Sequence, residues 1–218
     1  MKNVSGGLLY NYNIEELHSL IKTNEIHPRD IVRECINRTK ETDPKYHVWS
    51  SFDDKDIINQ ISDDFLFTNT EYDMSGIPVA IKDIFNTKTL PTQMGSPIWK
   101  NFMAGNDARV VHSLKEAGAI ICGKTVTAEF AVHKLNETLN PHDISLTPGT
   151  SSSGSAVSVA TGVCSVAIGS QTAGSIVRPA SFTGVYGFKP SYGLVPRTGM
   201  LKTTDTLDSI GFFTIHYK

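Results

Sequence analysis

The most constraining feature of this sequence is a long stretch without charge. Residues 144–177, 34 in all, contain no Asp, Glu, Lys, Arg or His, although 19% of the whole chain is charged. Ser, Thr and Gly interrupt the apolar residues every few positions, which excludes a membrane span. The stretch therefore predicts buried secondary structure: a small-residue helix at 156–163, a strand buried on both faces at 163–168, and a turn at 169–174.

Composition places the chain among globular proteins. Its 39% of hydrophobic residues and net charge of −2 exclude intrinsic disorder. Lys and Arg number 20 against 22 Asp and Glu, so there is no basic excess of the kind that nucleic acid requires. We expect no nucleic-acid partner and no membrane association, and the 218 residues suffice for one sizeable core without disulfides.

Cysteine usage and the first residues bear on the compartment. Cys35, Cys122 and Cys164 are far apart and lack the spacing of metal ligands, so we expect three small buried hydrophobes in a reducing compartment. We expect neither a metal nor a cofactor. The apolar run within residues 1–10 is too short for a secretory signal, and a cytoplasmic location is therefore the expectation.

Residues 1–73 predict a mainly helical N-terminal region. Asn13 and Glu16 form a capping box ahead of apolar residues at helical spacing. Pro28 suits the first turn of a second helix, which should end before the Asp43-Pro44 turn. The polar, acidic stretch at 50–73 is interpreted as a surface loop that contains one short helix, at 56–61.

The character of the sequence changes at residue 76. Residues 76–83 alternate as a short strand, with Ile77, Val79 and Ile81 on one face and Pro78, Ala80 and Lys82 on the other. Further on, Asp107 is placed to cap a helix that Gly118 ends, and a buried strand follows at 119–122. A helix followed by a strand indicates an α/β fold, with a mixed sheet covered by helices.

Residues 149–155 (GTSSSGS) have the composition of a flexible Gly/Ser linker. Their flanks argue against that interpretation, because the segment leads directly into the uncharged helix and strand. A phosphate-binding loop is the obvious competitor, but no Gly-Lys-Ser/Thr follows and Gly-x-Gly-x-x-Gly is absent. We interpret the segment as a loop that brings backbone amides and hydroxyls close to a ligand.

A serine nucleophile needs a sharp turn, a base and backbone donors for an oxyanion. The turn at 171–175 offers Ser175 and successive amides. Histidine is a poor candidate for the base, since none lies between His142 and His216 and none has an evident acidic partner, although spacing in the sequence does not exclude one. Lys82, on an apolar strand beside small residues, is the alternative, because burial lowers the pKa of lysine. For the amine to be partly neutral at working pH, that pKa must fall from about 10.4 to about 7 or 8. The folded structure must offset the free-energy cost of this shift, about 3 to 5 kcal/mol.

Five segments resemble, in order, motifs of the amidase signature family. They are GIPVAIKD (76–83), GAIICGKTVTAEF (118–130), GTSSSGS (149–155), QTAGSIVR (171–178) and VYGFKPSYG (185–193). The first is similar to the family's Gly-Ile-Pro-x-x-x-Lys-Asp, the third to its Gly-Gly-Ser-Ser-Gly-Gly-Ser loop, and the fourth to its nucleophile turn. The likeness covers nearly the whole chain, as the N-terminal portion of an amidase signature domain.

This resemblance implies an amidohydrolase that cleaves a small-molecule linear amide through an acyl-enzyme. The family uses a Ser, cis-Ser, Lys triad, which the resemblance assigns to Ser175 as nucleophile, Ser151 as bridge and Lys82 as base. The implied oxyanion hole consists of the amides of Thr172, Ala173, Gly174 and Ser175. The implied partner is the amide substrate. Separately, a half domain would expose apolar surface, and forming a homo-oligomer is one way to cover it.

Departures from the family pattern concern the two Ser-containing segments. Thr150 and Ser153 replace glycines, and Ala173 replaces the first glycine of Gly-Gly-Ser, where a Cβ disfavours positive φ. Gln171 stands where many members, including the glutamyl-tRNA amidotransferase subunit, carry Asp. Arg178 lies where some hydrolases of the family hold a substrate carboxylate, and is a candidate clamp.

Each of these residues also has a structural interpretation. Lys82 would be a solvated residue at a strand edge, Ser151 and Ser175 would be helix N-caps, and Arg178 would form a surface ion pair. The joint pattern favours catalysis for the first three, while the two interpretations of Arg178 are equal. We assign no catalytic role to the other polar residues of the motifs. Lys124, Glu129 and Lys189 are interpreted as structural, and the sequence indicates no role for Asp83.

Three functions remain in view. The first is an amidase. The second is a catalytically inactive truncated fragment, since the family's domain is about twice as long and residues 212–218 depart from the pattern of 74–211. The third is a noncatalytic or amidotransferase-type subunit, against which Gln171 and the missing second half weigh.

Overall fold

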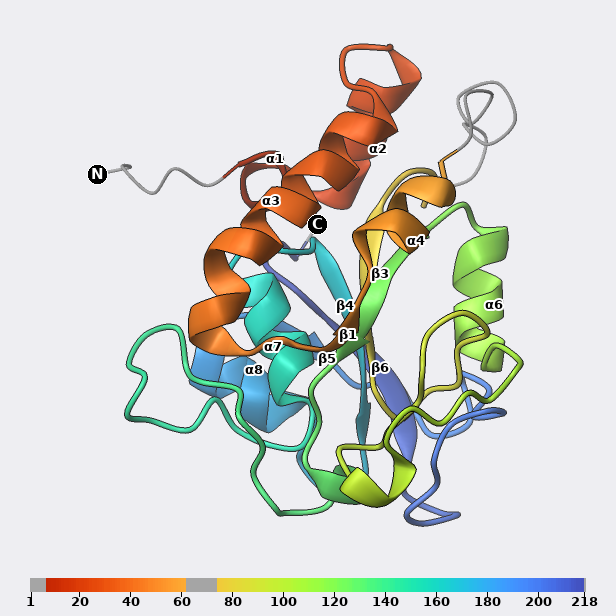
Figure 1. Ribbon diagram of the computed structural model, residues 1–218, viewed down its shortest axis with the longest axis vertical. Helices are drawn as coiled ribbons and strands as arrows, with labels where there is room; N and C mark the ends of the chain where they lie inside the picture. Colours follow the sequence, from red (N-terminus) through yellow and green to blue (C-terminus); the bar gives the residue numbers. More distant parts are fainter. Residues whose placement is uncertain (1–6, 62–73, 218) are drawn as a thin grey trace.

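The computed structural model describes residues 7–61 and 74–217, which form a six-stranded mixed sheet in the order β1-β3-β2-β4-β6-β5 (Figure 1). β2 runs parallel to β3 and β4, and the other pairs are antiparallel. The strands are β1 (Trp49–Phe52), β2 (Pro78–Lys82), β3 (Ile120–Thr125), β4 (Val166–Gln171), β5 (Tyr186–Phe188) and β6 (Ser209–Thr214).

Helices cover both faces of the sheet: α3, α7 and α8 lie on one face and α6 on the other (Figure 1). The described helices are α1 (Leu8–Asn11), α2 (Ile14–Lys22), α3 (Pro28–Tyr46), α4 (Asp54–Asn59), η1 (Pro97–Trp99), α6 (Arg109–Glu116), η2 (Glu129–Ala131), α7 (Ser153–Ala160) and α8 (Val177–Thr183). None of the helices within 7–61 and 74–217 has the length and apolarity needed to cross a membrane. The predicted α/β fold with a mixed sheet is confirmed.

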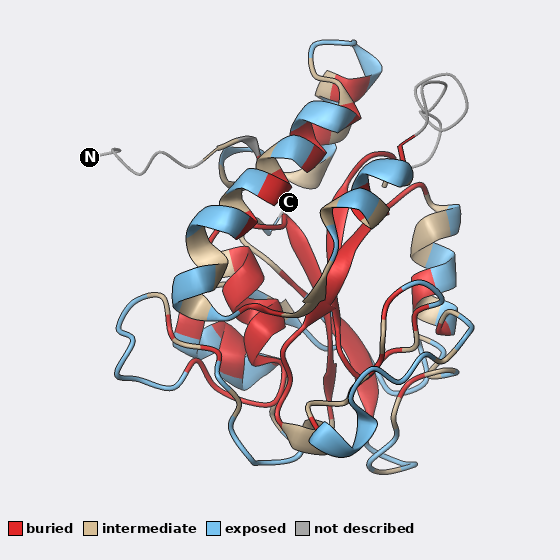
Figure 2. Ribbon diagram, viewed as in Figure 1, coloured by how far each residue is buried: buried red, intermediate tan, exposed pale blue. Residues whose placement is uncertain are grey.

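The alternation of side chains along β2 divides the core into two layers. Val79 and Ile81 pack in a cluster that includes Val111 of α6, whereas Ala80 packs in the cluster beneath α3 and α7. Both faces of β2 are therefore buried, and Figure 2 shows burial along the sheet beneath helices whose outer faces are exposed. Lys82 follows in register on the face of Ala80, so its side chain enters the interior.

The predicted capping box of α2 is confirmed, because Asn13 and Glu16 each accept the other's amide hydrogen. The predicted end of the second helix is wrong. α3 continues through Pro44 to Tyr46. A proline in the last turn removes few hydrogen bonds, and the Asp43 carboxylate accepts the amides of Val48 and Trp49 at 2.6 and 3.1 Å beyond the helix end.

The prediction of loop from residue 50 is also wrong at its start. Residues 49–52 form β1, which pairs antiparallel with β3 and buries Trp49. A partner strand distant in sequence thus overrides the polar local composition. The short helix is confirmed as α4, capped by the Asp53 side chain, whereas 62–73 lies outside the described residues. The sequence pattern separates the motif region, 74–211, from a divergent tail, 212–218. β6 (Ser209–Thr214) runs across this boundary, so the first residues of the tail belong to the sheet.

Asp107 does not cap α6 as predicted. The N-cap is Ala108, without a side-chain hydrogen bond, and the Asp107 carboxylate instead accepts the Lys88 amide and the Lys115 ammonium, each at 2.8 Å. The predicted end at Gly118 is confirmed, with φ of +85°. The strand expected at 163–168 is β4, which lies three residues later, at Val166–Gln171. The turn expected at 169–174 therefore starts at residue 172.

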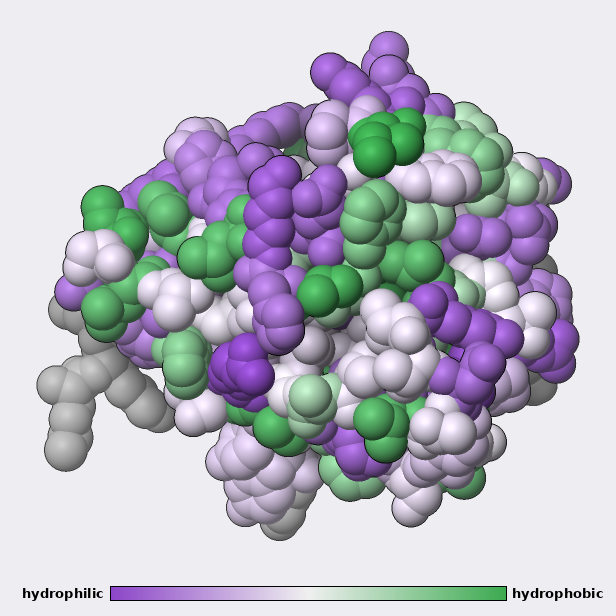
Figure 3. Space-filling view, turned by 90° about the horizontal axis from the view of Figure 1, so that it is seen from below, coloured by the Kyte–Doolittle hydropathy of each residue, from purple (hydrophilic) through white to green (hydrophobic). Residues whose placement is uncertain are grey.

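Large apolar side chains remain exposed on several parts of the molecule. Some belong to helices, such as Ile98 of η1 and Phe182 of α8, or to connecting segments, such as Leu135. The view from below shows apolar patches separated by polar side chains (Figure 3). Others, including Tyr186, Phe188 and Phe212, lie on β5 and β6 and line an open apolar cavity of about 710 Å³. β5 is the outermost described strand on that side of the sheet.

Candidate active site

Lys82 and Ser151 meet in the interior. The Lys82 Nζ atom, at the end of β2, lies 2.7 Å from Ser151 Oγ and 2.9 Å from the Oγ atom of Ser170 on β4. Lys82 and Ser151 have no solvent exposure. The alternative of a solvated lysine at a strand edge is therefore wrong.

The protonation of Lys82 is set by its burial. Loss of solvation lowers the pKa of Lys82 from 10.5 to about 7, against the opposing attraction of the Asp208 carboxylate. Near neutral pH a large fraction of the amine is therefore unprotonated. The predicted fall in the pKa of Lys82 agrees with this value.

The loop that carries Ser151 is built into the core rather than being a linker. Gly149 has φ of +83°, and a Cβ there would lie 2.8 Å from Pro179 Cα, so only glycine fits this approach to α8. The Thr150–Ser151 peptide bond is cis. The Ser152 hydroxyl donates to the Ser170 carbonyl at 3.2 Å, which ties the loop to β4. The N-cap of α7 is Ser152, so Ser151 does not cap that helix.

A turn after β4 holds Ser175. The Gln171 Oε1 atom accepts the amides of Ile176 and Val177 at 2.8 and 2.9 Å, which closes the turn and satisfies the start of α8. Ser175 is half-buried, and its hydroxyl has no hydrogen-bond partner within the described part of the chain. The N-cap of α8 is Ile176, so Ser175 is not a helix cap either.

The turn borders a cavity of about 150 Å³. Its lining includes the whole of the predicted oxyanion segment, 172–175, which ends at Ser175. Arg178 and the segment 131–133 also line the cavity. Among the described residues, the amides of Ala173, Gly174 and Ser175 have no backbone or side-chain acceptor. Neither Ala173 nor Gly174 has a positive φ, so the Cβ of Ala173 is accommodated without strain.

Arg178 is exposed at the rim of this cavity. A Cβ on Gly174 would lie 3.3 Å from Arg178 Nη2, which places the guanidinium beside the turn. Arg178 forms no ion pair with any acidic side chain of the described residues. The structure therefore brings Lys82 to Ser151, and Ser175 to Arg178 and the turn amides, while Ser170 and Gln171 of β4 connect the two groups.

Sequence reasoning missed Ser170 and Asp208. Ser170 hydrogen-bonds Lys82, and the Asp208 carboxylate accepts the hydroxyl of Thr172 and the amides of Thr203 and Thr204. Burial raises the pKa of Asp208, but the hydrogen bonds from these threonines prevail and the net shift is downward. In the sequence Asp208 is the second of two aspartates among threonines in residues 203–208 (TTDTLD), and this pattern does not reveal proximity to Lys82.

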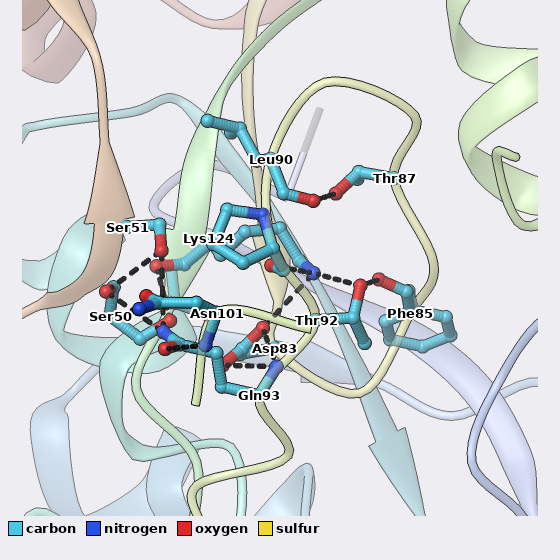
Figure 4. A network of polar contacts seen from close by, with 12 residues as sticks. Ser50, Ser51, Asp83, Phe85, Thr87, Leu90, Thr92, Gln93, Asn101 and Lys124 are labelled. Carbon is cyan, nitrogen blue, oxygen red and sulfur yellow. Dashed lines mark hydrogen bonds and ion pairs between the residues drawn. The ribbon is translucent and has the colours of Figure 1, made fainter. Parts of the chain in front are cut away.

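Asp83, which had no role in the sequence interpretation, forms a buried ion pair. Its carboxylate lies 3.0 Å from the Lys124 Nζ atom, with both side chains inaccessible to solvent, and also accepts the Gln93 amide (Figure 4). Lys124 further donates to Thr92 Oγ1 at 2.9 Å and to the Pro91 carbonyl at 3.1 Å. The pair fixes the segment 91–93 against β3 and against the end of β2, next to Lys82, which supports a structural role for Lys124.

Burial moves both members of this pair toward neutrality. It raises the pKa of Asp83 and lowers the pKa of Lys124, in each case against the attraction between them. Such a pair is sensitive to the loss of either member, because the remaining charge would be buried alone.

Comparison with known proteins identifies the family to which the chain belongs. The model of the amidase family matches residues 30–216. The A subunit of glutamyl-tRNA(Gln) amidotransferase from Cyanothece sp. is 39% identical over 210 residues, covering 92% of this chain and 44% of the relative.

Solved structures give the same result. Peptide amidase from Stenotrophomonas maltophilia superposes with a TM-score of 0.86 at 30% identity, covering 94% of this chain and 45% of that one. The A subunit of glutamyl-tRNA(Gln) amidotransferase from Thermotoga maritima superposes with a TM-score of 0.82 at 34% identity, covering 94% and 44%. The chain thus spans less than half the length of these relatives.

Proposed function

This chain belongs to the amidase family, and we propose that it hydrolyses a linear carboxamide to a carboxylate and ammonia or an amine. Ser175 is the nucleophile, Ser151 the bridging serine and Lys82 the base. The observation that carries the proposal is the buried contact of 2.7 Å between Lys82 Nζ and Ser151 Oγ, at a lysine whose pKa is lowered to about 7.

The first half of the reaction uses the neutral amine. A neutral amine has one lone pair and two N–H groups, so Lys82 accepts the Ser151 proton while donating to Ser170. Ser151 in turn accepts the proton of Ser175 as that hydroxyl attacks the carbonyl carbon. The amides from Thr172 to Ser175 stabilise the oxyanion, where one lost donor typically raises the barrier by roughly 3 to 4 kcal/mol.

The second half reverses the relay. The proton returns through Ser151 to the leaving nitrogen as the C–N bond breaks, leaving Ser175 acylated. Water then attacks the acyl group, giving up a proton through the same path, and the carboxylate is released with Ser175 restored. Arg178 at the cavity rim is suited to hold a substrate carboxylate in a charge-assisted contact.

Covalent labelling tests the nucleophile. A fluorophosphonate probe should add once to the chain in intact-mass spectra, and Ser175→Ala should abolish the adduct. Ser181→Ala is the matched control, since it removes an exposed hydroxyl from α8 and should leave labelling unchanged. An adduct that survives Ser175→Ala would contradict the assignment, and a folded wild-type chain that is never labelled would favour the inactive fragment.

An amidotransferase-type subunit is the second candidate, because relatives at 39% identity are named as the A subunit of glutamyl-tRNA(Gln) amidotransferase. Ammonia release distinguishes the two. Release from glutamine but not from a C-terminally amidated peptide favours the amidotransferase-type function, and the opposite preference favours a free-standing amidase.

We propose further that two copies of the chain associate through the apolar cavity on β5 and β6, which exposes Tyr186 and Phe188. Analytical ultracentrifugation should show a dimer that Tyr186→Lys dissociates, and a monomeric wild type would contradict it. The cytoplasmic location remains a prediction, supported by three free cysteines of the kind that a reducing compartment maintains.

A further inference from the structure

The three cysteines of the chain, although far apart in the sequence, meet in the core. Cys35 lies on α3, Cys122 on β3, and Cys164 in the connection between α7 and β4. All three are fully buried, and their sulfur atoms lie within 4.8 Å of one another, with 3.9 Å between those of Cys35 and Cys164. Burial was predicted, but this convergence was not.

The spacing of the sulfur atoms is that of a coordination site. A metal–thiolate bond is about 2.3 Å, so three sulfurs around one ion stand about 4 Å apart. The contact of 3.9 Å between Cys35 and Cys164 already has this length, and Cys122 lies within reach of it. Two regular elements, α3 and β3, and the buried residues that lead into β4 hold the donors in place.

We propose that Cys35, Cys122 and Cys164 bind one soft, three-coordinate metal ion, of which Cu(I) is the probe of choice. Structural zinc is almost always four-coordinate. Among the described residues this cluster supplies only three sulfur donors, which lie inside the apolar core beneath α3 and therefore suit zinc poorly. Soft thiolates select Cu(I), and a site with three sulfur donors suits it. On binding, the copper remains Cu(I) and no electron is transferred, and each thiol that becomes a thiolate ligand releases its proton to the solvent.

Anaerobic titration of the full chain with Cu(I), in competition with a chromogenic Cu(I) chelator, tests the site. One ion should bind per chain. Cys122→Ala and Cys164→Ala should each weaken binding about 100-fold or more, because one of three donors is lost. Met103→Leu is the control, since it removes an exposed thioether and should bind as the wild type does.

A second measurement does not depend on variants that fold. The Cu K-edge X-ray absorption spectrum of the loaded wild-type chain should show three sulfur neighbours. Failure of the wild type to compete with the chelator, a different number of sulfur neighbours, or equal binding by a folded cysteine variant would each overturn the proposal. These outcomes are independent of the Ser175 labelling that tests the proposed function.

Discussion

The Lys82 amine lies 2.7 Å from the Ser151 hydroxyl at a position without solvent exposure. A protonated lysine has no lone pair and can only donate to that hydroxyl, whereas the neutral form accepts from it. The state of one buried amine therefore decides whether the relay from Ser175 operates. Because burial lowers the pKa of Lys82 to about 7, this decision falls within the physiological pH range.

The rate of labelling of Ser175 should therefore depend on pH. In the wild type the second-order rate constant should rise about tenfold per pH unit below 7 and level off above it, as the neutral amine becomes fully populated. Lys82→Met should label slowly and without this transition. Rates measured by intact mass between pH 5.5 and 9 check this, and a flat wild-type profile would rule out Lys82 as the base.

Stability should depend on the same group. The pKa of Lys82 is about 7 in the folded chain and about 10.4 unfolded, so between these values the unfolded state binds more protons and the free energy of unfolding increases with pH. Relative to Lys82→Met, the wild type should gain about 3 to 5 kcal/mol from pH 7 to 10, with no change below pH 6. Urea unfolding at each pH measures this difference. A constant difference across the range would show that Lys82 titrates normally.

Asp208 should tune this titration. Its carboxylate raises the pKa of Lys82, so Asp208→Asn should shift the midpoint of the pH–rate profile to lower pH. Asp205→Asn is the control, because Asp205 is exposed nearby in the chain. A midpoint that moves to higher pH, or equally in both variants, would contradict the assigned influence.

Strand alternation and the turn after the uncharged strand pointed to Lys82 and Ser175 in the sequence, whereas Ser151 was assigned through the resemblance to the amidase signature family. The structure brings Lys82 and Ser151 into contact, and the catalytic roles of all three residues stay predictions. Ser170 and Asp208 were missed because both act on Lys82 from positions far along the chain. Ser170, the nearer of the two in sequence, is 88 positions from Lys82. The cysteine cluster was missed for the same reason. Local signals were also overruled where tertiary contacts compete, as for the continuation of α3 through Pro44.

Gln171 should be needed for the shape of the nucleophile turn. Gln171→Ala leaves the amides of Ile176 and Val177 without their acceptor, which should lower the free energy of unfolding by roughly 1 to 3 kcal/mol and slow labelling of Ser175. Gln171→Glu retains an acceptor oxygen at the same reach and should recover both. Unfolding and labelling that are unchanged in Gln171→Ala would mean that the turn holds its shape without this side chain.

The ion pair between Asp83 and Lys124 should behave as a single buried unit. Lys124→Met leaves the Asp83 carboxylate without its partner and should lower the free energy of unfolding by about 3 to 5 kcal/mol, as should Asp83→Leu by stranding the ammonium. The double variant removes both charges and should lose clearly less than the sum of the single variants, because no isolated charge remains. Lys134→Met is the matched surface control, since Lys134 is 69% exposed in its pair with Glu129 and its loss should change stability by about 1 kcal/mol or less. Urea unfolding of the four variants and the wild type measures the coupling, and additive single losses would show that the two side chains act independently.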